Sequence, residues 1–314
     1  MAHDRTTEDI STDDRRRADD RPDVLLLGRA PRPVTGAELA ARVRSALVEE
    51  VAGDLAEGAV EHLDRLRVSA TVDGPDVLTL DVDLSGVVVR PTLSADGDAT
   101  PTDERAAPVP ADAAAREDGV LRRLRVDAHP VTMEGVPVDL VLEAQDVPFR
   151  WVEGTDGSLG VETVEPDDDA PLVGHVRVAA PQDALVATAR RLVEEPLRTL
   201  GGLSLSSFDV EIESTGSRSA RGTGFARVRK GILSASIHAR ASIEVDAAMV
   251  LTVRELSLTS RNPVVAAALL AARKHVDEAQ GQTVDLAAEL PAGIRLADVR
   301  LDVGESVAVS ARFA

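Results

Sequence analysis

The chain of 314 residues contains no cysteine and no tyrosine, and it has only one tryptophan and four phenylalanines. The absence of cysteine excludes disulfides, thiolate catalysis and cysteine-bound metals, but it leaves the compartment open. Because aromatic residues make up only 2% of the sequence, the interior must be aliphatic. Such an interior lacks the rings that usually stack on bases or sugars. Lys230 and Lys274 are the only lysines, which argues against a Schiff-base enzyme.

Basic residues are too few to balance the acidic ones, and the formal net charge is −19. This balance argues against binding to nucleic-acid phosphates and against electrostatic docking on an anionic membrane. It is also typical of a soluble protein whose charge says nothing about its partners.

Long apolar segments are also missing. The longest run, Val264 to Ala272, has nine residues, whereas a membrane-spanning helix needs about 20. Val24–Leu27 is too short for the apolar core of a signal peptide. We therefore expect a soluble and cytoplasmic protein without a signal peptide or transmembrane segment.

Many stretches alternate Val or Leu with Asp, Arg or Ser, as in residues 68–72 and 78–84. Apolar residues at every second position predict strands with one apolar face and one polar face that is exposed to solvent. The predicted strands are 66–73, 77–84, 120–128, 131–134, 136–143, 172–178, 203–213, 223–229, 232–246, 249–259, 294–303 and 306–313. Residues 94–118 and 153–170 are acidic and are predicted to form loops.

Three segments show helical rather than strand periodicity. The first, 35–64, starts with the capping-box spacing of Thr35 and Glu38 and continues as a stripe of apolar residues every fourth position. The others are predicted at 182–200, which Gly201 and Gly202 should end, and at 263–279 after Asn262.

These elements predict an α+β fold in which highly curved antiparallel β-sheets wrap around long amphipathic helices. Residues 1–33 are expected to form a disordered tail, and 34–314 a single domain. Residues 119–142 and 231–253 show similar alternation, and each set follows a helix. A division into halves 34–180 and 181–314 is therefore a second interpretation, although alternation of this kind often recurs by chance.

No arrangement of residues points to catalysis. The six histidines are all more than four residues apart, and the chain has neither a G-x-S-x-G elbow nor a phosphate-binding loop. Asp81 and Asp83 share a strand face, which is best explained as a polar sheet surface. Residues 167–169, three consecutive aspartates, lack the pattern of a calcium loop. We predict no catalytic residue, no metal and no cofactor.

The C-terminal stretch from Leu290 to Arg300, with Leu290-Pro291-Ala292-Gly293 at its start, is followed by an alternating last strand at 307–312. This ending resembles that of the actinobacterial LmeA-like phospholipid-binding family, and residues 119–142 resemble its repeated strands. The resemblance covers about 35–314. It implies a tubular lipid-binding fold, with a long helix wrapped by a curved sheet and an apolar groove for acyl chains. Members of that family are usually exported or anchored, and this chain shows no export signal.

The residues and the resemblance together lead to one functional hypothesis. An aliphatic curved sheet with few rings leaves room for a lipid or phospholipid acyl chain, and each buried methylene contributes roughly 0.8 kcal/mol. Nucleic acid is not expected as a partner, whereas transient contact with a membrane is compatible with this hypothesis. The predicted lining residues, taken from alternation and helix stripes, are Leu47, Val51, Leu80, Val82, Leu192, Leu251 and Leu269.

Two alternatives remain open at this point. The helices could fill the sheet completely and leave a dry core. The protein could also be a structural module that assembles through exposed sheet edges without any lipid.

Overall fold

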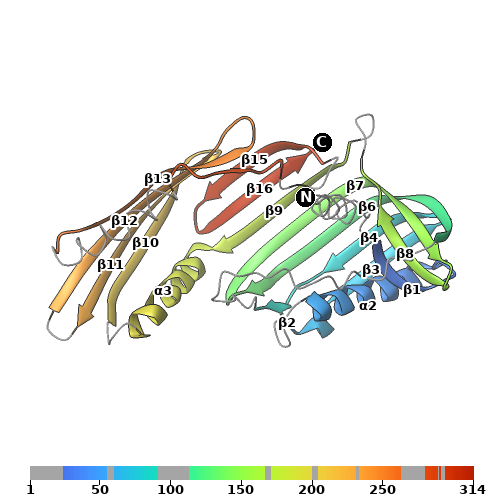
Figure 1. The fold of residues 1–314 in the computed structure, drawn as a ribbon, viewed down its shortest axis with the longest axis horizontal. Coiled ribbons are helices and arrows are strands. Elements are labelled where there is room, and N and C mark those ends of the chain that lie inside the picture. The colour runs from blue at the N-terminus through green and yellow to red at the C-terminus, as the bar shows by residue number, and fades with distance from the viewer. Residues whose placement is uncertain are drawn as a thin grey trace, which may run out of the picture.

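Two open β-sheets and two α-helices make up the described part of the chain (Figure 1). The structure is a computed structural model. It describes residues 24–54, 60–90, 113–166, 171–199, 204–230, 233–262, 280–288, 290 and 294–314. The coarse prediction of an α+β fold with curved sheets is confirmed, and the described residues are mostly strand, with open sheets and few helices.

The larger sheet has eleven strands, and its main path runs β15-β16-β9-β7-β6-β4-β3. Its strands are β1 (Val24–Arg29), β2 (Val60–Glu61), β3 (Arg67–Asp73), β4 (Asp76–Asp83), β5 (Val88–Val89), β6 (Ala113–Met133), β7 (Val136–Gly154), β8 (Ser158–Thr163), β9 (Val173–Pro181), β15 (Leu296–Val303) and β16 (Ser306–Phe313).

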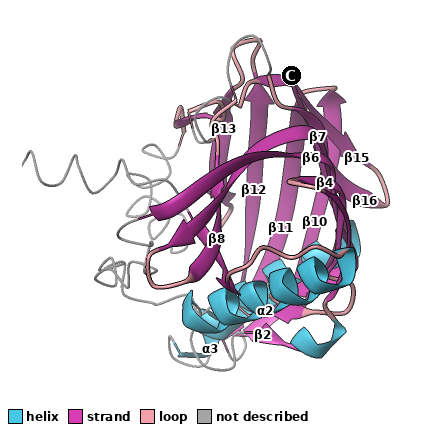
Figure 2. Ribbon diagram, turned by 90° about the vertical axis from the view of Figure 1, so that its right-hand side faces the viewer, coloured by secondary structure: helices cyan, strands magenta, loops and turns pink. Residues whose placement is uncertain are grey.

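The smaller sheet has five antiparallel strands in sequence order. They are β10 (Ser204–Gly216), β11 (Ser219–Lys230), β12 (Leu233–Val245), β13 (Val250–Ser260) and β14 (Thr283–Asp285). The helices are α2 (Gly36–Asp54), α3 (Gln182–Thr199) and the short 3-10 helix η1 (Leu63–Arg65). Figure 2 shows the strands curving around one side of the molecule, with α2 and α3 along its lower edge.

The main hydrophobic core surrounds α2. Leu39, Val43 and Ala46 on the helix are buried against Val77 of β4 on one side and Leu27 of β1 on the other. Apolar side chains from β7 and β8 close the cluster: Phe149, Trp151 and Leu159. Leu39 and Val43 belong to the predicted stripe of every fourth residue, whereas the next buried position is Ala46, and the predicted Leu47 is only partly buried beside it.

The start of α2 is fixed by local chemistry. Thr35 Oγ1 accepts a hydrogen bond from the backbone N–H of Glu38 at 3.3 Å, as the capping-box spacing predicts. Gly36 lies so close to β3 that a Cβ atom there would clash with the carbonyl of Ala70. Glycine is therefore needed for the helix to approach the sheet.

The α2 core is enclosed because β7 changes partners along its length. Residues 139–145 pair with β9, whereas residues 149–153 pair with β8, which in turn pairs with β1. Near this change Trp151 Nε1 donates to the carbonyl of Pro75 at 2.9 Å, and the ring of Phe149 stands edge-on to Trp151. The second part of β7 thus supplies Phe149 and Trp151 to the α2 core.

Several predicted boundaries are wrong. The first helix does not extend to 64 as predicted: its described part is Gly36–Asp54, and Val60–Glu61 pairs with Val88–Val89 instead. Part of the predicted tail is strand β1, because its apolar residues complete the α2 core. The predicted loops overlap strands too, since 113–118 belongs to β6 and 158–163 is β8.

The long-range arrangement also corrects two expectations. The pairs β4–β6 and β5–β6 are parallel, so the larger sheet is not wholly antiparallel. The C-terminal hairpin of β15 and β16 pairs with β9 in the larger sheet. The segment 181–314 therefore contributes to both sheets, and the sheets do not divide at 181.

An ion cluster joins the two sheets. Asp298 of β15 accepts from Arg218 Nη2, in the turn between β10 and β11, at 2.7 Å and from Arg300 Nε at 2.9 Å. Arg312 of β16 lies 3.5 Å away. The hydrogen bonds from Arg218 and Arg300 lower the pKa of Asp298 to about 2. The carboxylate is thus held in its charged form at the junction.

We predict that Leu159→Ala will destabilise the fold by about 3 kcal/mol, because Leu159 is fully buried beside α2 and its loss leaves a cavity. Urea unfolding measures the change. Leu78→Ala is the control, since Leu78 is 38% exposed and should cost less than about 1 kcal/mol. Equal losses in the two variants would contradict the placement of the core.

A second prediction concerns acid stability. Because the folded-state pKa of Asp298 is below the ordinary 3.8, its stabilising effect is present above pH 4 and is lost as the pH falls towards 2. Asp298→Asn should therefore lower Tm at neutral pH, and the difference from the parent protein should disappear near pH 2. Thermal unfolding across this range tests it, with Asp302→Asn on the exposed side of the same strand as the control. A Tm difference that persists at pH 2 would contradict the electrostatic cause.

Candidate functional site

One face of the larger sheet, here called the inner face, is apolar across seven strands. A level is here a row of residues that pair with one another across neighbouring strands. At one level that runs from β3 to β15, every residue is aliphatic. These residues are Val68, Val82, Val126, Leu142, Val176, Ala311 and Val299. The α2 core covers this face at the β3 and β4 end.

The next level of the inner face is covered at β7, where Leu140 packs against the buried cluster of Val87, Ala128 and Val131, and is more exposed on β9 and β16. Leu140, Val178, Val309 and Leu301 are neighbours on β7, β9, β16 and β15. The exposed fractions of Val178 and Val309 are 39% and 43%. The two valines pair across β9 and β16 and so form a small exposed apolar patch on this face.

The opposite, outer face carries charges at the corresponding positions. One level reads Asp81, Arg125, Glu143, His175, Arg312 and Asp298. Within it, Arg125 Nη1 donates to Glu143 Oε1 at 3.0 Å. The outer face is therefore the solvated one.

The smaller sheet has the same division. Its apolar face includes Val210, Gly224, Ala239 and Leu258 at one level, and Ile212, Gly222, Ala241 and Leu256 at the next. Leu258 is 38% exposed. The other face carries Glu211, Thr223, Arg240 and Ser257 at a single level.

The two apolar faces meet at the junction of the sheets. Val245 and Met249 from the smaller sheet are buried with Val299 of β15. Leu251 and Ala311 pack against this cluster from the two sides. The inner face thus continues from one sheet to the other.

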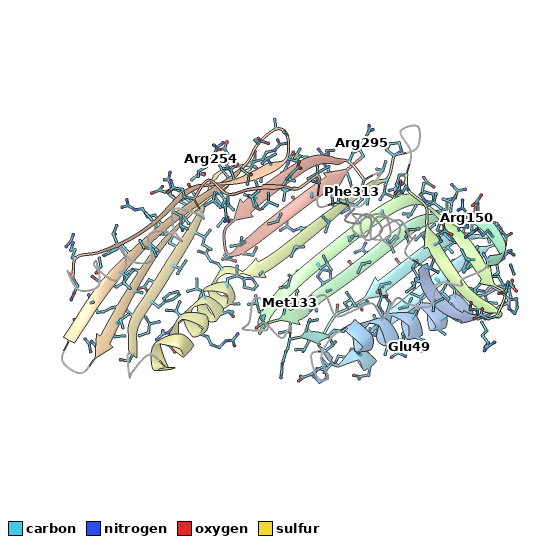
Figure 3. The ribbon with its side chains drawn as sticks, viewed as in Figure 1. Glu49, Met133, Arg150, Arg254, Arg295 and Phe313 are labelled. Carbon is cyan, nitrogen blue, oxygen red and sulfur yellow. The ribbon has the colours of Figure 1, made fainter. Side chains whose placement is uncertain are left out.

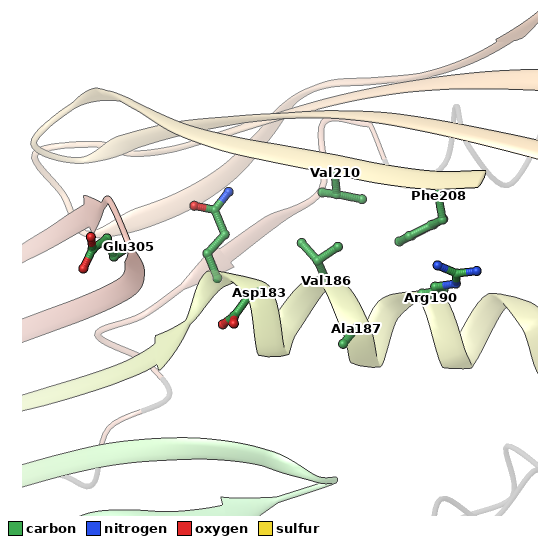
Figure 4. Close-up of a pocket in the computed structure, with 8 residues that line it drawn as sticks. Asp183, Val186, Ala187, Arg190, Phe208, Val210 and Glu305 are labelled. Carbon is green, nitrogen blue, oxygen red and sulfur yellow. The ribbon is translucent and has the colours of Figure 1, made fainter.

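A recess lies between α3 and β10, beside this junction (Figure 4). Its volume is about 730 Å³, and Val186 of α3 faces Val210 and Phe208 of β10 across it. Charged side chains stand at its two ends. They are Asp183 and Glu305 at one end and Arg190 at the other, where Arg190 Nε donates to Glu194 Oε1 at 2.9 Å.

Gln182 holds this end of α3 to both sheets. In the amide orientation that satisfies both neighbours, its side chain donates to the carbonyl of Gly304 at 2.8 Å and accepts from Ile212 N–H at 3.1 Å. Its own N–H donates to the carbonyl of Glu305 at 3.0 Å. Because β10 is an edge strand, Ile212 N–H has no partner in a neighbouring strand, and the side-chain oxygen of Gln182 accepts its hydrogen bond instead.

The seven predicted lining residues lie in different places. Leu47 and Leu80 pack in the α2 core, Val82 is buried on the inner face, and Leu251 packs at the junction. None of these four borders the α3 recess. The side chains of Val51 on α2 and Leu192 on α3 and all of Leu269 lie outside the described residues.

Sequence reasoning missed the exposed part of the inner face. Val178 and Val309 belong to predicted alternating strands, but alternation does not tell which face is covered. A bulge adds to the difficulty, because Thr71 pairs with Thr79 and Val72 with Val77. Leu78 has no partner and is exposed, although strict alternation would place it beside Leu80.

The described residues contain no group of three His, Asp or Glu side chains that could hold a metal ion. Hydrogen bonds from the side chain and the backbone of Ser85 lower the pKa of Asp83, so this carboxylate is ionised and poorly suited to proton transfer at neutral pH. Residues 167–169 lie outside the described residues.

Comparisons with protein-family models, curated proteins and solved structures found no match. In the described part of the chain, no helix has both the length and the apolar character needed to cross a membrane.

We predict that Gln182→Ala will destabilise the protein by about 1–2 kcal/mol, because Ile212 N–H and the carbonyl of Gly304 lose their shared partner. Urea unfolding provides the measurement. Asp183→Ala is the neighbouring control, since Asp183 accepts a local hydrogen bond from Ala184 N–H and does not bridge the sheets as Gln182 does. A larger effect for Asp183→Ala than for Gln182→Ala would contradict the bridging role.

Proposed function

We propose that this chain is a non-catalytic protein that binds an apolar lipid along the inner face shared by its two sheets. The observation that carries this proposal is the pair Val178 and Val309, which are adjacent and each about two-fifths exposed on a face that is aliphatic across seven strands. A lipid chain would cover these side chains without any specific motif.

The chemistry of the face suits a flexible aliphatic chain. Most of the members named above are valine, leucine, alanine and isoleucine; Gly222 and Gly224 lie on the smaller sheet, and Phe208 lies near the α3 recess. Roughly 0.8 kcal/mol per buried methylene gives useful affinity from one acyl chain. The charged ends of the recess offer places for a polar head group, in keeping with apolar sites that hold a few polar anchors.

The position of α2 supports the finer fold hypothesis. A long helix enclosed by β1, β8 and the bent β7 matches what the resemblance to the LmeA-like family implies for a tubular lipid-binding fold. In this proposal α2 fills one end of the curved sheet, and the lipid occupies the part that α2 leaves open.

Assembly through sheet edges has less support. The smaller sheet ends in β14, a strand of three residues, and short edge strands discourage pairing between molecules. At its other edge, Ile212 N–H is already occupied by Gln182. These features reduce the backbone groups available to a second chain.

Lipid extraction and mass spectrometry of the purified protein, with uptake of a fluorescent fatty acid, test the proposal. Val178→Asp should weaken uptake roughly tenfold or more, because a carboxylate against an acyl chain costs more than the 1.4 kcal/mol that corresponds to tenfold. Val173→Asp is the matched control on the same strand, because Val173 pairs with Gln145 at an outer-face position and is 49% exposed.

The outcomes separate clearly. Lipid in the purified protein and a loss confined to Val178→Asp would support binding on the inner face. A protein free of lipid that takes up no fatty acid would refute the function. Equal losses in Val178→Asp and Val173→Asp would refute the position of the site.

A further inference from the structure

Helix α3 is attached to the rest of the structure less firmly than α2. On α2, Leu39, Val43 and Ala46 are buried. None of the α3 side chains that the structure describes, those of residues 182–191, 193 and 194, is buried. Elements with few buried apolar contacts open at the lowest cost in free energy, and the parts of a protein that move on ligand binding are drawn from them. Helix α3 is therefore easier to displace than α2.

Two sets of hydrogen bonds hold the described part of α3 against the sheets. At its first residue, Gln182 bonds to Ile212 of the smaller sheet and to the β15–β16 turn of the larger one. Further along the helix, Arg191 Nη2 donates to the carbonyl of Glu134 in the turn between β6 and β7. The helix is thus fixed to both sheets at one end and to a single turn at a second point.

The β6–β7 turn is shaped to receive Arg191. Glu134 and Gly135 have positive φ angles of 54° and 80°, as in the type I′ turns of tight hairpins. Because Gly135 has no side chain, the guanidinium of Arg191 can lie against it; a Cβ atom there would be 3.3 Å from Nη1. Arg191 is exposed, so its hydrogen bond to Glu134 forms in competition with water. This contact between Arg191 and Glu134, here called the latch, is specific in geometry but easily broken.

The apolar surface near α3 is open on one side and loosely covered on the other. Val178 of β9 is 39% exposed, whereas Ala180, the next residue on the same face and nearer to α3, is 8% exposed. On the smaller sheet, Phe208 and Val210 line the recess of about 730 Å³ that α3 covers without filling (Figure 4). A displacement of α3 away from β10 would uncover these two side chains and give a lipid chain additional apolar surface to bind.

We infer that α3 is a lid that controls the entry of the lipid. It turns about Gln182, releases the latch and opens the recess at Phe208 and Val210. Because the hydrogen bonds of Gln182 lie at the first residue of the helix, they persist while the rest of α3 moves. This inference rests on the proposed function, since it assigns to α3 the admission of the same ligand to the same apolar face.

Two spin labels beside the latch test the movement without any ligand. The chain has no cysteine, so Val193→Cys on α3 and Met133→Cys next to Glu134 place two thiols in an otherwise thiol-free protein. Both side chains are about two-fifths exposed, so the labels should leave the fold intact. Electron paramagnetic resonance should show one short distance in the latched state. Arg191→Ala should raise the ratio of long to short distances about fivefold, the factor that corresponds to one typical hydrogen bond.

Arg190→Ala is the matched control, because it removes the neighbouring arginine of the same helix. Arg190 pairs with Glu194 within α3, so its loss should change the ratio of distances by less than about twofold. Arg191→Lys keeps a charged donor at the latch and should restore much of the short-distance population.

Stopped-flow uptake of the fluorescent fatty acid connects the movement to the ligand. In Arg191→Ala, uptake and release should both accelerate about fivefold, whereas the affinity should stay nearly unchanged. The reason is that the latch is lost from the free and the loaded protein alike, so the change cancels in the binding equilibrium. A residue that only contacts the lipid would change the affinity instead.

The outcomes separate the lid from the proposed function. Faster exchange and a larger long-distance population in Arg191→Ala, but not in Arg190→Ala, would support the lid. If the parent protein binds the fatty acid and Arg191→Ala takes it up at the parent rate, the function stands and the lid is refuted. Equal effects of the two alanine variants, or an unchanged distance in Arg191→Ala, would also refute the lid. If the parent protein takes up no fatty acid, the proposed function is wrong and the admission of lipid by α3 fails with it.

Discussion

Continuous alternation in register is the constraint on which this structure depends. From β3 to β15, each strand places its aliphatic residues on the same face as its neighbours, and its charged residues on the other. A sheet with one apolar face must bury it against another layer. In the described residues, α2 covers one end of the larger sheet and α3 lies at the junction with the smaller one. The remaining aliphatic surface, marked by Val178 and Val309, is the basis of the proposed function.

The scarcity of aromatic residues has a structural counterpart. The only tryptophan, Trp151, and one of the four phenylalanines, Phe149, lie together in the core beside α2, where large rings fill the space inside the bend of β7. Elsewhere the apolar faces carry mainly valine, leucine, isoleucine and alanine, with glycines on the smaller sheet. The labelled residues Met133 and Phe313 lie near the borders of the inner face (Figure 3). Met133 is 44% exposed.

The two sheets are held in one arrangement by a small number of specific contacts. Asp298 and Arg218 form an ion pair across the junction on the outer side, and Gln182 bridges both sheets beside α3. The aliphatic cluster around Val299 closes the inner side. Because these contacts act on both sides of the junction, they hold the two apolar faces next to each other.

The sequence by itself determined the local elements and the general character of the surfaces. Thr35 and Glu38 identified the start of α2, and alternation identified most strands, including β10 to β13 and the last hairpin, because these signals act between residues close in the chain. Strand β8 was missed because it lies in an acidic context, and it forms through pairing with β1 and β7. Among the predicted lining residues, Leu47 and Leu80 were apolar and inward as expected, but they belong to the α2 core.

Only the tertiary structure decided which part of the aliphatic face is covered. The bulge that turns Leu78 outward, the parallel pairing of β4 with β6 and the return of β16 to β9 all depend on partners distant in sequence. A shift of one residue in any of these pairings would reverse the faces. Alternation therefore determined that an apolar face exists, whereas long-range register determined that α2 covers Leu80 while Val178 and Val309 stay accessible.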